Sequence, residues 1–108
     1  MIEMTQAENA VWEIRDGTPE NGGGIAWVGR SAGNSLASGF GRLRGGRTPE
    51  KTLEYDEVIH VLQGTFSVSC GGVETVARAG GVLSISRGAT VAYFGVQAEF
   101  FFVVTAAR

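Results

Sequence analysis

Short runs rich in Val, Ile, Phe, Thr and Ser alternate along this chain with clusters of glycine. The glycine clusters stand at 22–24, 45–46, 71–72 and 80–81. Runs of β-branched and aromatic residues between turn formers are typical of β-strands, and no segment keeps a helical period over three turns. The pattern predicts strands at 11–15, 25–30, 37–44, 52–62, 65–70, 73–78, 82–86, 90–95 and 99–105.

Many short, evenly spaced strands favour an all-β sandwich or barrel. The sequence "CGGVE" predicts a two-residue hairpin, since glycines at 71–72 supply the positive φ angles that such turns need. A length of 108 residues fits one compact domain. We therefore expect a single β-barrel domain over 11–108, preceded by a loose N-terminal arm at 1–10.

The composition excludes several classes of partner. The net charge is −2 and the basic residues are scattered, so the chain lacks the electrostatic footprint of a nucleic-acid binder. No apolar stretch approaches the roughly 20 residues that span a bilayer, and residues 1–10 do not resemble a signal peptide. One cysteine, Cys70, fits a reducing compartment. We expect a cytoplasmic protein that binds neither nucleic acid nor membranes.

The stretch "YDEVIHVLQG" places three ionisable side chains in an expected strand. Strand side chains alternate between faces, so Tyr55, Glu57 and Ile59 share one face and His60 lies on the other. A carboxyl group between aliphatic neighbours is partly desolvated, which raises its pKa toward the range of a general acid or base. Glu57 is thus a candidate acid/base. The alternative remains open that Glu57 is a structural hydrogen-bond partner.

The same alternation suggests further pocket residues. Phe40, Arg42 and Arg44 share one face of "SGFGRLR", and an inward Arg42 would pair with Glu57 or hold an anionic group. Tyrosines would supply hydroxyl donors and a tryptophan an apolar wall. We predict catalytic roles for Glu57, Tyr55 and Arg42, and ligand contacts from Trp27, Phe40, Arg44, Ile59, Val91 and Tyr93.

Two stretches, "YDEVIHVLQGTFSV" and "ARAGGVLSISRGATVAYF", resemble the two conserved motifs of the cupin superfamily. The first has Glu57 followed by Gly64 at the motif spacing, whereas Ser86 stands at the usual proline of the second. Residues 25–108 are similar to the C-terminal domain of the EutQ family. The resemblance implies a cupin double-stranded β-helix, a jelly-roll barrel with a central ligand pocket, and a homodimer.

The resemblance also implies where a cupin metal would bind, through two histidines and a glutamate from the first motif and a histidine from the second. Of these ligands only Glu57 is present. One carboxylate falls short of the three or four ligands of zinc or iron sites, so we expect no metal and no other cofactor. The histidine positions are occupied by Lys51 and Leu53 (or Glu50 and Thr52 with a longer spacer) and by Val91.

Members of the EutQ family are associated with acetate kinase activity and with ethanolamine-processing compartments. Ile59 and Ala92 replace acids of that family, and no GxxxxGK[ST] sequence is present, which counts against a kinase. Three functions stay open: a metal-independent isomerase, cyclase, lyase or dehydratase acting on a small, fairly apolar substrate; a EutQ-like accessory protein; and a non-catalytic ligand-binding module. Glu57 favours the first.

Overall fold

The computed structural model describes residues 2–14, 23–28 and 35–105. In this part of the chain one turn of 3-10 helix, η1 (Ala7–Asn9), precedes the strands. The strands are β1 (Gly24–Val28), β2 (Leu36–Leu43), β3 (Lys51–Thr52), β4 (Glu57–Cys70), β5 (Val73–Arg78), β6 (Val82–Ile85) and β7 (Thr90–Thr105).

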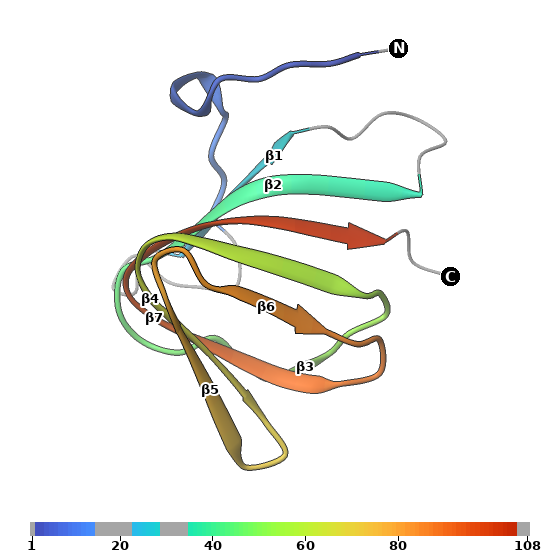
Figure 1. The fold of residues 1–108 in the computed structure, drawn as a ribbon, viewed down its shortest axis with the longest axis vertical. Helices are drawn as coiled ribbons and strands as arrows, with labels where there is room; N and C mark the ends of the chain where they lie inside the picture. Colours follow the sequence, from blue (N-terminus) through green and yellow to red (C-terminus); the bar gives the residue numbers. More distant parts are fainter. Residues whose placement is uncertain (1, 15–22, 29–34, 106–108) are drawn as a thin grey trace.

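The two longest strands, β4 and β7, form the centre of one antiparallel sheet (Figure 1). The sheet runs in the order β1-β2-β7-β4-β5, while β3 pairs with β7 and β6 pairs with β4. The first half of β4 pairs with β6 and the end of β7, and its second half pairs with β5 and the start of β7. The sheet therefore rolls up around one core, and the prediction of an all-β single domain is confirmed.

β4 and β7 bend together at a shared corner. The pairing register shifts on either side of Gln63, and the adjacent Gly64 has a φ of 71°. A side chain at Gly64 would collide with the carbonyl oxygens of Val96 and Gln97, so only glycine fits this close crossing. The bend explains why the sequence pattern shows four strands at 52–62, 65–70, 90–95 and 99–105 where the structure has two long ones.

Two predicted strand boundaries are wrong. The strand expected at 11–15 is absent from residues 11–14, where only Glu13 pairs with Ile25, through two backbone hydrogen bonds of 2.9 Å; residue 15 lies outside the described residues. The strand expected at 52–62 begins only at Glu57. The carboxylate of the preceding residue, Asp56, accepts a hydrogen bond of 2.9 Å from the backbone N–H of Arg87.

Other local predictions hold. The hairpin between β4 and β5 turns at Gly71 and Gly72, whose φ angles are 59° and 81°. The alternation along β4 is as expected, with Glu57 and Ile59 buried and His60 exposed on the opposite face. The loose arm expected at 1–10 stays a prediction. Within the described ranges no helix is long and apolar enough to cross a membrane.

Candidate functional site

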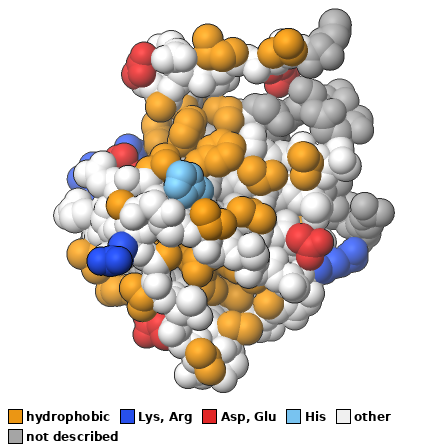
Figure 2. Space-filling view, in the orientation of Figure 1, with side chains coloured by type: hydrophobic (Ala, Val, Ile, Leu, Met, Phe, Trp, Pro, Cys, Tyr) orange, Lys and Arg blue, Asp and Glu red, His pale blue; other side chains and the backbone are white. Residues whose placement is uncertain are grey.

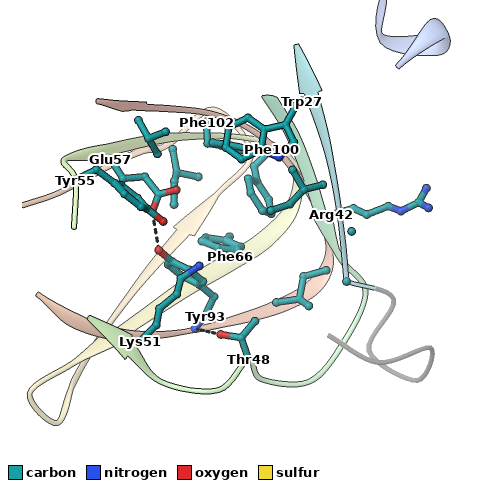
Figure 3. Close-up of a pocket in the computed structure, with 16 residues that line it drawn as sticks. Trp27, Arg42, Thr48, Lys51, Tyr55, Glu57, Phe66, Tyr93, Phe100 and Phe102 are labelled. Carbon is teal, nitrogen blue, oxygen red and sulfur yellow. Dashed lines mark hydrogen bonds between the residues drawn. The ribbon is translucent and has the colours of Figure 1, made fainter. Parts of the chain in front are cut away.

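The barrel holds a pocket lined by residues of β1, β2, β3, β4 and β7 (Figure 3). Its cavity volume, measured for the centre of a water-sized sphere, is about 90 Å³. A single water occupies roughly 10–15 Å³ on this measure, so the enclosed part suits a ligand of roughly six to nine non-hydrogen atoms. Its lining residues are Gly23, Gly24, Ile25, Trp27, Arg42, Leu43, Thr48, Lys51, Tyr55, Glu57, Ile59, Phe66, Tyr93, Phe100, Phe102 and Val104.

One side of the pocket is an aromatic wall, made of Trp27, Phe66, Phe100 and Phe102. The rings of Phe66 and Phe100 lie 4.5 Å apart, and Trp27 meets Phe102 edge-on with centroids 5.2 Å apart. Such tilted and edge-on contacts are the preferred aromatic geometries. The wall therefore offers a flat ligand a preformed apolar surface (Figure 3).

Glycines of β2 make room for this wall. Gly39 pairs with Phe102 and Gly41 with Phe100 in the sheet. A side chain built on Gly41 would overlap the ring of Phe100, and one on Gly39 would come 2.9 Å from the ring of Phe102. Because β2 has no side chains at these two positions, the rings lie against its backbone.

Facing the wall is a polar corner, made of Lys51, Glu57 and Tyr93. The Tyr93 hydroxyl donates a hydrogen bond of 2.5 Å to Oε1 of Glu57, and the carboxyl side chain is only 8% exposed. The Lys51 ammonium lies 5.2 Å from the centroid of the Tyr93 ring, within cation–π range. A carboxylate, a hydroxyl and an ammonium thus come together at the edge of an apolar cavity.

Three pairings fix this corner. Tyr93 and Thr48 are joined twice, through Thr48 N–H to the Tyr93 carbonyl at 2.8 Å and Tyr93 N–H to the Thr48 hydroxyl at 2.9 Å. In the pair next to Lys51 and Val91, the hydroxyls of Thr52 and Thr90 lie 2.8 Å apart on the exposed side of β3 and β7. Since Thr52 faces outward, the neighbouring Lys51 faces the pocket.

The structure brings most of the predicted site residues to the pocket and leaves three outside it. Trp27, Arg42, Tyr55, Glu57, Ile59 and Tyr93 line the pocket, whereas Phe40, Arg44 and Val91 do not.

The expected inward face of β2 is wrong. Phe40 packs against Phe101 on the outside of the sheet, with ring centroids 5.7 Å apart, and Arg44 is exposed. The inward positions of β2 are instead the buried Gly39, Gly41 and Leu43. Val91 is fully buried and contributes to the core. It is the partner of Lys51 in the pairing of β3 with β7.

Arg42 touches the pocket rim but turns away from Glu57 (Figure 3). Its guanidinium lies 4.3 Å from the centroid of the Trp12 ring, in the segment before β1. An arginine over an aromatic face is held by cation–π attraction. The expected pairing of Arg42 with Glu57 is therefore absent from the contacts that the structure describes.

The residues at the cupin ligand positions do not fit a metal ion. Lys51 carries a cationic head, and Leu53 and Val91 have no donor atoms. His60, on the outer face of β4, points away from Glu57. Across the described ranges no three His, Cys, Asp or Glu side chains lie close enough together to hold a metal ion.

Sequence reasoning missed Lys51 as a pocket residue. β3 has only two residues, too few to show alternation. The available signal was its place at a motif histidine, because that position in the cupin barrel faces the ligand.

Comparisons with known proteins agree with the fold. The model of a family described as "Ethanolamine utilisation protein EutQ" matches residues 12–108. No curated protein sequence matches the chain.

Solved structures give the same picture. An ethanolamine utilization protein Q from Salmonella typhimurium LT2 is 26% identical with a TM-score of 0.85, and the match covers 99% of this chain and 88% of that one. The EutQ protein of Clostridium difficile is 23% identical with a TM-score of 0.66, over 79% and 70% of the two chains. An RmlC-like cupin from Shewanella frigidimarina is 16% identical with a TM-score of 0.79, over 100% and 94%. The predicted cupin jelly-roll barrel is confirmed.

Proposed function

The chain belongs to the EutQ family of cupins, and from that premise we propose that its barrel is a metal-independent site for proton-transfer chemistry on a small, fairly apolar substrate. The observation that carries the proposal is the buried hydrogen bond of 2.5 Å between Tyr93 and Glu57, open to an apolar pocket. A buried carboxyl group that is positioned by a tyrosine hydroxyl and lines an apolar pocket is suited to act as a general base.

The reaction class that these groups suit is isomerisation or elimination next to a carbonyl. A Glu57 oxygen takes a proton from the carbon beside the carbonyl, the C–H bond breaks, and its electron pair moves to the carbonyl oxygen as an enolate. In an isomerisation the proton then returns from Glu57 to another carbon of the same molecule. No oxidant, reductant or cofactor is consumed. The Tyr93 hydroxyl is the donor that positions Glu57, and the side chain of Tyr55 also lines the pocket.

The test is exchange of carbon-bound hydrogen for deuterium in D2O, followed by proton NMR with a chelator present. Cyclohexanone, cyclohex-2-enone and acetophenone serve as probes, since each has six to nine non-hydrogen atoms. We expect exchange above the buffer rate for at least one probe, and a loss of roughly 100-fold or more in Glu57→Gln. Glu54→Gln, which changes an exposed acid nearby, is the matched control and should exchange as the wild type does.

Two results would contradict the enzyme proposal. One is exchange that Glu57→Gln leaves unchanged. The other is the absence of exchange with all three ketones. If a ketone binds equally well to both proteins without exchanging, the barrel is a non-catalytic ligand-binding module.

Membership of the EutQ family favours a second candidate, an accessory role in ethanolamine utilisation, either as an acetate kinase or as a compartment-associated subunit. A kinase requires magnesium and a nucleotide near the pocket. Calorimetric titration with ATP in magnesium and in chelator tests this candidate. Magnesium-dependent binding that acetate strengthens would support a kinase, and no binding in either buffer would exclude one.

We also propose that the protein is a homodimer. The outer face of β4 and β6 exposes Val58, Leu62 and Val82 around the histidine, and Figure 2 shows hydrophobic side chains gathered there. Contiguous exposed apolar side chains of this kind mark interaction surfaces. Light scattering after gel filtration should give twice the mass of one chain, and Val58→Lys should shift the protein to monomer. A monomeric wild type at micromolar concentration would contradict this proposal.

A further inference from the structure

Lys51 brings a positive charge into the pocket next to the proposed acid/base pair. Its strand β3 is pinned against β7, and its ammonium lies over the ring of Tyr93, whose hydroxyl is bound to Glu57. Figure 3 shows the side chains of Lys51, Tyr93 and Glu57 converging on one side of the cavity, with the aromatic wall across from them. The ammonium and the carboxylate are thus both within reach of a small ligand.

The charges of the corner select against ionised ligands. Lys51 and Glu57 carry opposite charges, and the guanidinium of Arg42 is engaged with Trp12 at the rim. A ligand carboxylate would bring a second negative charge near Glu57, and a ligand ammonium would face Lys51. Each would also be attracted by the opposite charge of the pair, so neither gains much, and both would lose solvation on entering an apolar pocket. An uncharged ligand with a polarised oxygen therefore fits best.

Proton transfer changes this balance in a way that uses Lys51. When Glu57 takes a proton its carboxyl group becomes neutral, and the negative charge appears on the carbonyl oxygen of the ligand. An ammonium beside that oxygen gains attraction as the charge develops. A contact that strengthens between the bound ketone and the transition state speeds the reaction, whereas one that binds both equally does not.

We propose that the pocket takes a small, uncharged, ring-containing ketone or aldehyde, whose ring lies on the aromatic wall and whose oxygen is received by Lys51, which stabilises the enolate. This inference rests on the proposed function, because Glu57 supplies the base. It gives Lys51 the anion-holding role that the sequence suggested for Arg42. The enclosed volume of about 90 Å³ suits a single substituted ring.

The inference is tested with 4-fluorophenol, whose ionised oxygen resembles an enolate and whose eight non-hydrogen atoms suit the cavity. Fluorine NMR distinguishes the bound phenol from the bound phenolate, so a pH titration gives the ratio of the two forms without any turnover. We expect Lys51→Met to shift this ratio toward the neutral phenol by about tenfold, a loss that one nearby charge is large enough to cause.

Matched variants separate charge from structure. Lys51→Arg keeps the charge and should restore most of the phenolate. Arg47→Met removes an equal charge from an exposed arginine that lies over Phe94 and does not line the pocket, so the ratio should change less than twofold. Lys51→Gln is a second neutral variant should Lys51→Met fold poorly.

The outcomes distinguish the two proposals. If 4-fluorophenol does not bind the wild type, or if it ionises equally in the wild type and both neutral variants, the role of Lys51 is overturned. A Lys51-dependent phenolate together with no ketone exchange would leave the ligand-binding inference standing and would contradict the acid/base proposal alone.

Discussion

The polar corner and the aromatic wall face each other across one pocket and are built in opposite ways. The wall consists of rings from β1, β4 and β7 that pack on one another and on glycine backbone, so it is continuous with the core. The corner takes one side chain each from β3, β4 and β7 and centres on a hydrogen bond between Tyr93 and Glu57. The wall therefore contributes mainly to stability, whereas the corner retains a buried acid that apolar packing alone would not need.

The largest expected effect comes from opening the wall with Phe102→Ala. Phe102 is 3% exposed and packs against Trp27, so its loss leaves a cavity and should lower the free energy of unfolding by roughly 3–5 kcal/mol. Chemical denaturation measures this. Phe101→Ala, one residue along on the outer side, is the control and should cost less. If both variants lost the same free energy of unfolding, the claim that the aromatic wall stabilises the fold more than the outer surface does would be wrong.

Adding a side chain on β2 behind the aromatic wall should have the next largest effect on the free energy of unfolding. In Gly41→Ala the new methyl group overlaps the ring of Phe100 and must push it toward the cavity. We expect a loss of about 1–3 kcal/mol in the free energy of unfolding, together with weaker binding of 4-fluorophenol. At Gly45 the same change meets no atom within 4 Å, so Gly45→Ala should leave binding unaltered. Unchanged binding in Gly41→Ala would contradict the assigned shape of the pocket.

Removing one hydroxyl from the corner should cost less stability. Tyr93→Phe keeps the ring against Phe66 but deletes the donor to Glu57, at a cost of about 1 kcal/mol in the free energy of unfolding. Ketone exchange should slow, but by a smaller factor than in Glu57→Gln, because Tyr93 positions the base. If exchange is lost as completely as in Glu57→Gln, Tyr93 is itself the proton-transfer group.

Much of the barrel could be predicted from the sequence because side-chain alternation is a direct consequence of strand geometry. It placed Glu57 inward and His60 outward correctly. It failed on β2, where the inward residues are Gly39 and Gly41 and the large Phe40 faces out. A hydrophobic pattern along β2 does not show that these glycines face inward. The space that their missing side chains leave is filled by the rings of Phe100 and Phe102, which belong to β7, far along the chain.

The pocket's charged residues were harder to place than its strands. Arg42 and Lys51 both line the pocket, yet Arg42 is drawn over Trp12, a contact between segments that no local pattern contains. Lys51 is oriented by pairing with Val91 of β7, which is also far from it in sequence. Long charged side chains are directed by such tertiary contacts, so their roles emerge only once the fold is known.

The most direct test of whether the polar corner is a working site compares the free energy of unfolding of the wild type and Glu57→Gln at several pH values from 5 to 8. Gln keeps an oxygen for the Tyr93 hydroxyl and removes a buried charge, so we predict that the variant is at least as stable as the wild type at pH 7 while ketone exchange is lost. A variant that is less stable by more than about 1 kcal/mol at every pH would contradict the account. The carboxylate would then be part of the barrel's architecture.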